Sequence, residues 1–443
     1  MIDFTLTDEQ QALQQKARDF AIKEVLPVSF YYDEHDDIPL DVLKKAYEAG
    51  LVNMSVPKEY GGPGYGILEG VIMIEEIAAA CPGLATSIFD NSLGTAPLLL
   101  STNDAAKKKY LPKLVDEFKL ICFGTSEPTT GSDVSGIRCE VKQDGEDYIL
   151  NGTKFWITNG GIADYMTVFA TTDPESKHGG IGAFLVEMDW EGVSQGRPIP
   201  KLGQRCSNTT GVHFDNVRVP KENVLAKPGD GFVLAMQTFS LTRPAIASFA
   251  VGAARSAMEF ALDYAKKRKT FGSKIKNYQG IQFKLADMYQ KVETSRLLTW
   301  KSAWDADNGR DANTSASVAK LYASEAAMEV VNEALQTFGG YGYTRFFPIE
   351  KFFRDTRLFM IYEGTSEIQR VVIAGFMLTN YEPVMPSLSD VPVQRSADPL
   401  ASTGKKSWRC GMCGYVHDGD EPPDACPYCF YPSGVFKDVT PAQ

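Results

Sequence analysis

The chain has 443 residues, 44% of them hydrophobic and 23% charged, and this balance excludes a disordered or fibrous protein. Lys and Arg number 45 against 56 Asp and Glu, and no basic block is present, so we expect no nucleic-acid partner. The acidic N-terminus and the lack of any apolar run near about 18 residues favour a cytoplasmic protein without a membrane span.

The first part of the chain, residues 1–118, is expected to form an all-helical domain. Helices are predicted to begin at Asp8 and near Asp41, and a third is predicted over residues 105–114. A glycine-rich stretch at 61–66 interrupts the helical pattern and indicates a loop.

From residue 119 to residue 232 the sequence changes to short β-rich runs, such as Tyr148–Leu150 and Tyr165–Ala170. The dipeptides Asp144-Gly145 and Asn151-Gly152 are typical of tight turns between strands. We therefore expect a central β domain, with a turn at each dipeptide.

Helical spacing returns in residues 233–380, the third predicted domain. One apolar stripe lies on a helix that should end near Gly309; its members are Ile281, Leu285, Met288 and Val292. A second stripe follows, and we expect both stripes to face the core; its members are Val318, Leu321, Tyr322, Met328, Val331 and Leu335.

Residues 381–406 contain several prolines and serines without periodicity and are predicted to be a linker. Residues 407–443 form a last module that is too small to fold without a staple. Two C-x-x-C pairs, Cys410/Cys413 and Cys426/Cys429, supply one, because their spacing lets four thiolates converge on a single metal. Geometry alone does not choose between iron and zinc.

This module resembles the short rubredoxin domain at the end of rubrerythrins, from Trp408 through the cysteine pairs to Phe436. The resemblance implies one iron on four cysteines that carries one electron, with structural zinc as the alternative. One position departs from the pattern. Glycine usually follows the second cysteine of each pair, as Gly414 does, but Phe430 stands in the other pair. If the backbone there needs a positive φ, Phe430 stores strain.

The body of the chain, residues 1 to about 380, resembles the acyl-CoA dehydrogenase family in five motifs that occur in the family's order. The resemblance implies an α+β multidomain fold with a helical N domain, a central β-barrel or sandwich and a C-terminal four-helix bundle. It also implies FAD as the cofactor. The motifs are Cys122–Asp133, Phe155–Gly160, Arg268–Gly272, Gly339–Gly342 and Ile361–Arg370.

Desaturation of a thioester needs a base for the Cα proton and an acceptor for the Cβ hydride. Glu363 is the predicted base by this resemblance. It precedes Ser366 to Gln369, a capping-box pattern that starts a helix, and Gly364 allows close approach of the substrate. Burial should raise the pKa of this carboxyl.

The resemblance also implies two groups of FAD contacts and a set of CoA contacts. The first FAD group lies along the central domain: Phe123, Thr125, Ser126, Gly131, Ser132, Trp156 and Thr158. The second matches positions that reach a neighbouring subunit's FAD or lie close to the base: Arg268, Thr270, Phe271, Gln279, Gln336, Gly340, Thr365 and Glu367. Ser132, Arg243, Glu363 and Gly364 match substrate contacts.

The sequence therefore predicts an FAD-dependent acyl-CoA dehydrogenase of fatty acid metabolism that forms a trans-2-enoyl-CoA, or runs the reverse reduction. We expect a homotetramer, a dimer of dimers, with an iron module that relays electrons to or from an electron-transfer flavoprotein. A zinc-ribbon tail that recruits a protein, or an acyl-CoA oxidase, are the alternatives. The absence of arginine from residues 91–97 favours a monocarboxylic acyl group, with a short or medium straight chain as the default.

Overall fold

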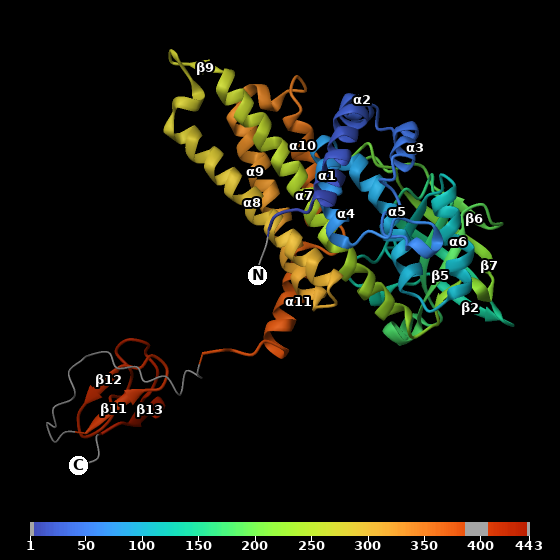
Figure 1. The fold of residues 1–443 in the computed structure, drawn as a ribbon. Coiled ribbons are helices and arrows are strands. Elements are labelled where there is room, and N and C mark those ends of the chain that lie inside the picture. The colour runs from blue at the N-terminus through green and yellow to red at the C-terminus, as the bar shows by residue number, and fades with distance from the viewer. Residues whose placement is uncertain (1–3, 386–405, 441–443) are drawn as a thin grey trace. The chain divides into compact units, whose positions relative to one another are not determined.

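The computed structural model describes residues 4–385 and 406–440 and divides the chain into two compact units, Met1–Thr379 and Asn380–Gln443 (Figure 1). Residues 386–405, most of the predicted linker, lie outside the described residues.

The larger unit begins with a group of helices. The side chains of Thr7 and Gln10 each accept a hydrogen bond from the other residue's backbone N–H, and this capping box starts the first helix at Asp8, as predicted. At the end of the group, the Asn103 side chain caps the sixth helix. The helices are α1 (Asp8–Phe20), α2 (Leu26–His35), α3 (Leu40–Glu48), α4 (Ile67–Ala80), α5 (Pro82–Leu100) and α6 (Asp104–Asp116).

An eight-stranded sheet follows, in the order β6-β7-β3-β2-β4-β5-β8, with β1 added parallel to β4. Its buried face holds mainly aliphatic side chains, among them Val141, Val168 and Val186. The strands are β1 (Ile121–Gly124), β2 (Glu140–Asp144), β3 (Asp147–Thr158), β4 (Tyr165–Thr171), β5 (Ile181–Glu187), β6 (Val193–Gln195), β7 (Thr209–Val219) and β8 (Val224–Ala226).

One of the two predicted turns is present. Asp144 pairs with Asp147 across a two-residue turn, so the turn at Asp144-Gly145 is confirmed. The turn at Asn151-Gly152 was wrong, because both residues lie inside β3. Gly152 has φ +137° at a register shift, and a Cβ there would lie 2.8 Å from the Cα of Cys139. The glycine therefore serves a β-bulge and a close backbone approach.

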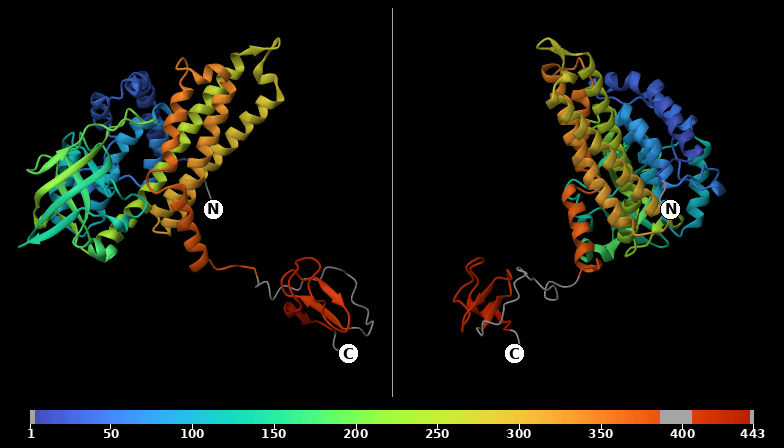
Figure 2. Two further views of the ribbon diagram at one scale, coloured as in Figure 1. Left: turned by 180° about the vertical axis from the view of Figure 1, so that it is seen from behind. Right: turned by 60° about the vertical axis from the view of Figure 1, so that its left-hand side comes forward.

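Long helices follow the sheet and lie side by side (Figure 2). They are α7 (Gly231–Lys267), α8 (Gln279–Asp307), α9 (Ala312–Phe338), α10 (Ile349–Thr356) and α11 (Ser366–Thr379). Two short strands, β9 (Lys269–Thr270) and β10 (Ser273–Lys274), form a hairpin between α7 and α8. Helix α8 ends just before Gly309, as predicted.

The predicted core stripe of α9 was mostly wrong. Val331 is buried, but Tyr322 is exposed and the other members are only partly buried. The fully buried face consists mainly of small residues, which let α7 and α9 approach closely. They include Ala316, Ala319, Ala323, Ala327 and Ala334. The predicted α8 stripe is half right, because Met288 and Val292 are buried whereas Ile281 and Leu285 are only partly buried.

Helix α7 is the one helix in the described parts of the chain that is long and apolar enough to cross a membrane. In the fold, 72% of its most apolar window is buried inside the protein. Its apolar character is therefore explained by its place at the centre of the helical domain.

The smaller unit contains a three-stranded antiparallel sheet, β12-β11-β13, built from β11 (Ser407–Cys410), β12 (Val416–Asp418) and β13 (Phe436–Asp438). Among the described residues of this unit, the buried hydrophobic core consists of Cys410, Cys426 and Phe436. Two of the three are cysteines of the predicted metal site, so the metal site and the core coincide.

Candidate active site and metal centre

Glu363 lies in the short loop before α11, in the left-handed region with φ +55°. The hydroxyl of Thr242, on α7, donates a hydrogen bond of 3.1 Å to Glu363 Oε2. The other carboxylate oxygen, Oε1, is shielded from solvent and has no hydrogen-bond partner among the described residues. A buried carboxylate oxygen without a partner is costly, and it is available to accept a proton from a ligand.

The backbone of this loop is held from two helices. Lys320 of α9 donates to the carbonyl of Gly364 at 2.6 Å. The side-chain amide of Gln369 donates to the carbonyls of Glu363 and Gly364 at 3.2 and 2.8 Å. Gln369 is thus turned toward the base, and the capping box predicted for Ser366 to Gln369 was wrong. Thr365 caps α11 instead, because its hydroxyl accepts from the N–H of Ile368 at 3.3 Å.

Burial raises the pKa of Glu363 to about 7, although Arg243, Thr242 and Lys320 favour its ionised form. Burial lowers the pKa of Lys320 to about 8. Asp90 on α5 is a second buried carboxyl, and burial together with the charge of Glu363 raises its pKa well above the usual range. The site therefore gathers several buried titratable groups whose pKa values are shifted by burial around Glu363.

Sequence reasoning missed Thr242, Lys320, Asp90 and Gln369. Thr242 is adjacent to the predicted Arg243 and Gln369 belongs to the last quoted motif, so these two could have been found by their neighbours. Lys320 and Asp90 lie far from the motifs in sequence and carried no signal. Arg243 itself is buried, and its guanidinium donates to Asn313 and Ser317 at 3.0 and 3.2 Å.

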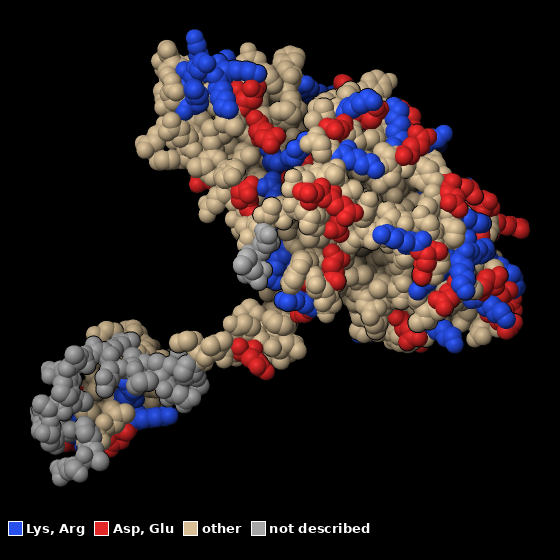
Figure 3. All heavy atoms as spheres, viewed as in Figure 1, with Lys and Arg blue, Asp and Glu red and all other residues tan. Residues whose placement is uncertain are grey.

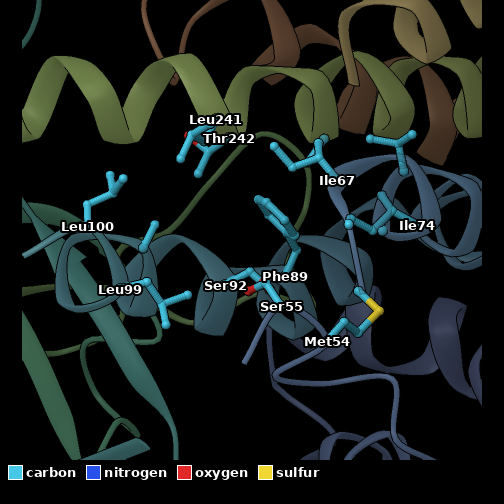
Figure 4. A pocket seen from close by; sticks show the side chains of 15 residues that line it. Met54, Ser55, Ile67, Ile74, Phe89, Ser92, Leu99, Leu100, Leu241 and Thr242 are labelled. Carbon is cyan, nitrogen blue, oxygen red and sulfur yellow. The ribbon is translucent and has the colours of Figure 1, made fainter. Parts of the chain in front are cut away.

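An apolar cavity of about 180 Å³ has Thr242, the residue that donates to Glu363, as part of its wall (Figure 4). Phe89 of α5 lines the cavity, and its ring packs edge-to-face on that of Phe249, with ring centroids 5.6 Å apart (Figure 4). The carboxylate of Asp307 caps the N-terminus of α4 beside the cavity by accepting from the N–H groups of Ile67 and Leu68. The labelled lining residues are Met54, Ser55, Ile67, Ile74, Phe89, Ser92, Leu99, Leu100, Leu241 and Thr242.

The central domain presents the first predicted FAD group at the ends of β1 and β3. Phe123 and Thr125 are buried, whereas Trp156 is 58% exposed with φ +64°. Trp156 lies at a register shift between Lys154 and Ile157, a bulge that changes the direction of its side chain. Thr158 ends the same strand and is partly buried.

A buried ion pair supports this region. Lys154 Nζ lies 2.7 Å from Glu127 Oε1 and 3.0 Å from the carbonyl of Thr125. Glu127 also accepts from two backbone N–H groups at residues 138 and 139, so each partner of the pair is satisfied. The following loop carries Gly131 and Ser132, both exposed, and Ser126, which is partly buried.

The second predicted FAD group is divided between two places. Thr365 and Glu367 lie beside the base, at the start of α11. Arg268 follows the last residue of α7, 25 residues after Arg243, which at about 1.5 Å per residue is a separation of about 37 Å. Lys and Arg gather around the β9–β10 hairpin at this end (Figure 3). The residues of this remote group are Arg268, Thr270, Phe271, Gln279, Gln336 and Gly340.

These observations test whether the residues fit FAD. The exposed face of Trp156 and the partnerless Glu363 Oε1 provide an aromatic surface and a base. Arg268 offers a guanidinium suited to a diphosphate. Phe271, on the turn of its hairpin, is 95% exposed, so its ring is accessible to a ligand. The residues of the first group and the Arg268 guanidinium therefore fit a flat aromatic cofactor with a diphosphate.

The four cysteines of the tail converge. Their sulfur atoms all lie within 4.8 Å of one another, with Cys410 and Cys429 at 3.6 Å and Cys413 and Cys426 at 3.4 Å. A tetrahedral ion with metal–sulfur bonds of about 2.3 Å separates its sulfur ligands by about 3.8 Å, so the donor set fits one metal.

The two cysteine pairs form matching turns. The N–H of Gly414 donates to the carbonyl of Cys410 at 2.9 Å, and the N–H of Phe430 donates to the carbonyl of Cys426 at 2.8 Å. Gly414 has φ +74° and Phe430 has φ +59°. The positive φ considered for Phe430 is therefore present, in a residue for which it is unfavourable.

Four family models match the chain. They are the acyl-CoA dehydrogenase N-terminal domain at residues 7–117, the middle domain at 122–217, the C-terminal domain at 229–378, and the rubrerythrin rubredoxin-like domain at 408–437. Together they cover the body and the tail.

Curated relatives and solved structures agree with the family models for the body of the chain. The chain is 42% identical over 378 residues to the mitochondrial short-chain specific acyl-CoA dehydrogenase of Rattus norvegicus, covering 85% of this chain and 92% of that one. It resembles butyryl-CoA dehydrogenase from Megasphaera elsdenii with a TM-score of 0.83 and 36% identity over 85% of this chain and 100% of that one. A chain described with the electron transferring flavoprotein of Acidaminococcus fermentans gives the same TM-score and identity, covering 86% and 100%.

Proposed function

The chain belongs to the acyl-CoA dehydrogenase family of oxidoreductases that act on CH–CH bonds, and from this premise we propose that Glu363 is the base that removes the Cα proton of a short acyl-CoA. The product is the trans-2-enoyl thioester, and the same residues serve the reverse reduction. The α+β fold and the rubredoxin-like tail expected from the sequence are confirmed.

The observation that carries this proposal is Glu363 Oε1, which has no hydrogen-bond partner among the described residues, together with Thr242, which donates to the other oxygen and lines an apolar cavity. A carboxylate whose pKa is about 7 holds a proton more strongly than an ordinary glutamate, which strengthens it as a base near neutral pH. Thr242 fixes one oxygen and leaves the other for the substrate. The backbone N–H of Glu363 is a donor for the thioester carbonyl in this proposal.

The cavity supports a short, monocarboxylic acyl chain. Its volume of about 180 Å³ is below the range of roughly 300–1,000 Å³ typical of drug-sized ligands. No Lys or Arg lines it within the described residues, so it offers nothing to pair with a second carboxylate. The relatives named for short-chain and butyryl substrates agree with this choice.

When bound, FAD supplies the acceptor for the Cβ hydride. Phe123, Thr125, Ser126, Gly131, Ser132, Trp156 and Thr158 are the residues proposed to hold the flavin side of the cofactor. The hydroxyl of Thr158 is proposed to lie near the reactive nitrogen. Arg243 is buried beside the base loop, which favours an electrostatic contribution to Glu363 in addition to its predicted substrate contact.

We propose that the subunits form a homotetramer. About 37 Å of helix separates the remote FAD group from Arg243, so that group is proposed to contact the FAD of a neighbouring subunit. The larger apolar side chains of α9 that do not reach the core, among them Val318, Leu321 and Met328, then face another subunit. Phe271, 95% exposed, is explained in the same way.

The tail is proposed to bind one iron and to relay single electrons to or from an electron-transfer flavoprotein. Cys413 and Cys429 are partly exposed, so one side of the metal site is close to the surface. The four other cysteines are free and buried, which agrees with a reducing, cytoplasmic location. Stopped-flow spectra test the relay: iron that stays oxidised while the flavin turns over would contradict it.

The proposed reaction is tested with butyryl-CoA and an artificial electron acceptor, comparing the parent with Glu363→Gln and with Glu382→Gln as an exposed control. We expect turnover by the parent and the control, and loss in Glu363→Gln with normal flavin content. Equal turnover in Glu363→Gln would reject the base. Oxygen consumption in place of dye reduction would indicate an oxidase, and zinc in a metal analysis would indicate the recruitment alternative.

A further inference from the structure

We propose that Gln204 is a positioning residue for Glu363 and acts through the hydroxyl of Tyr362. Gln204 lies on the loop between β6 and β7, far from every motif used above. This inference rests on the proposed role of Glu363 as the base.

The loop that carries Gln204 is fixed against α10. Gln204 is fully buried and has φ +49°. Its backbone N–H donates to Asp355 Oδ1, and its side-chain amide donates to the carbonyl of Asp355 at 3.1 Å. At Gly203 a Cβ would lie 2.4 Å from the carbonyl carbon of Arg354, so the glycine allows the loop to approach the helix.

Asp355 is itself held in place. Lys351, one helical turn earlier, donates to Asp355 Oδ2 at 2.5 Å and lies 3.3 Å from the sulfur of Cys81. All three side chains are fully buried. A buried ion pair of this kind depends on good geometry, so Gln204 is anchored to a rigid group.

From Gln204 the hydrogen bonds continue to the base loop. The Oε1 of Gln204 lies 3.0 Å from the hydroxyl of Thr86, on the first turns of α5. That hydroxyl lies 3.4 Å from the hydroxyl of Tyr362. Burial raises the pKa of Tyr362, so its hydroxyl remains neutral and able to donate.

Tyr362 precedes the base directly. The carbonyls of Glu363 and Gly364 are held by Gln369 and Lys320, as described above. The Tyr362 hydroxyl holds the other side of the loop, which must keep Glu363 in a left-handed conformation. Since a displacement of about 1 Å at a reacting group can cost about 10²-fold in rate, loss of this hold should appear in kcat.

The experiment measures butyryl-CoA turnover by the full-length holoenzyme in Gln204→Met, Tyr362→Phe and the double variant. We expect each single variant to lower kcat about 10-fold with KM within about 2-fold, and to raise the isotope effect of an α-deuterated substrate. The double variant should be no slower than either single variant, because both changes interrupt one connection. Thr86→Val should resemble them, and Thr86→Ser, which keeps the hydroxyl, should retain activity.

Tyr110→Phe is the matched control, since it removes another buried hydroxyl, which contacts Glu187 and Asn223 at 2.8 and 2.7 Å in a different core. It should lower thermal stability comparably and leave kcat unchanged. Single variants that behave like Tyr110→Phe, or a double variant slowed about 100-fold, would overturn the inference. If Gln204→Met does not fold, the kcat values of Tyr362→Phe and Thr86→Val test the same hydrogen-bonded connection. Failure of the parent to turn over would instead reject the proposed function.

Discussion

The carboxylate of Glu363 and the four thiols of the tail are both reactive groups, but the chain surrounds them in opposite ways. Around Glu363, side chains from α7, α9 and α11 fix a loop, and one carboxylate oxygen has no hydrogen-bond partner in the part of the chain that the structure describes. In the tail, the reactive side chains are themselves most of the core. The carboxylate of Glu363 is positioned by helices that pack through other side chains, whereas the thiols are part of the tail's own core.

Removing the metal should have the largest effect and should separate the two regions. A chelator or Cys410→Ser should unfold the tail, because the binding free energy of a structural metal, about 10–16 kcal/mol for zinc peptides, becomes folding free energy. The melting temperature of the body should not change. Calorimetry with near-UV circular dichroism checks this, and a tail that stays folded after metal removal would contradict the comparison.

Glu363→Gln should have the next largest effect, without any loss of fold. General bases typically contribute about 10²–10⁴-fold in rate, so kcat should fall by that factor. The unfolding midpoint should stay equal to or exceed that of the parent, since the substitution removes a buried charge. Denaturant titration beside the turnover assay measures both quantities, and a large loss of stability would mean that the base is part of the structural core.

Phe89→Leu should widen the cavity and change the preferred chain length. One methylene in an apolar pocket changes specificity by about 10–200-fold, so the ratio of kcat/KM for hexanoyl-CoA over butyryl-CoA should rise by about 10-fold. Phe249→Leu, which removes the ring that Phe89 contacts, serves as the control for lost packing. An unchanged ratio would place the acyl chain elsewhere.

The pH dependence should follow the raised pKa of the base. Glu363 acts when ionised, so kcat/KM should rise with pH through about 7 and fall on the acid side. Lys320 favours the ionised form of Glu363. Lys320→Met should therefore move this acid limb of the kcat/KM profile to higher pH, whereas Lys320→Arg should leave it near its original position. A limb that moves to lower pH in Lys320→Met would mean that another group titrates.

Phe430→Gly should give the smallest effect. A left-handed residue other than glycine costs roughly 1–2 kcal/mol, and glycine has no such cost, so the metal-loaded tail should gain about 1 kcal/mol. Gly414→Ala in the matching turn should lose a similar amount. Denaturation of the loaded tail checks both signs, and equal destabilisation by both substitutions would mean that the Phe430 ring makes an important contact.

The two regions also differ in how well sequence alone describes them. The spacing of the four cysteines predicted the metal site of the tail, because two short C-x-x-C pairs allow few arrangements of the four sulfur atoms. The position of Phe430, where glycine usually stands, indicated a possible positive φ. The resemblance predicts Glu363 as the base, which stays a prediction, and it does not predict the side chains around Glu363. Thr242, Lys320 and Asp90 come from separate helices, and only the packing of those helices brings them together.

Errors in the predicted elements have physical causes. The α9 stripe was chosen for its large apolar residues, but the close approach of α7 selects the alanines for the core. Asn151-Gly152 has the composition of a turn, yet the glycine is needed for a bulge in the middle of a long strand. In the Ser366 to Gln369 pattern, the glutamine binds the carbonyls of the base loop, a contact that competes with capping.

The two cysteine turns of the tail have similar backbone geometry, but the side chains that follow them differ. Beside Cys413, Gly414 leaves bare backbone; beside Cys429, Phe430 extends an aromatic ring that is 81% exposed. Any protein that contacts the metal site beside Cys429 therefore meets an exposed aromatic ring at residue 430, whereas at the matching position beside Cys413 it meets backbone.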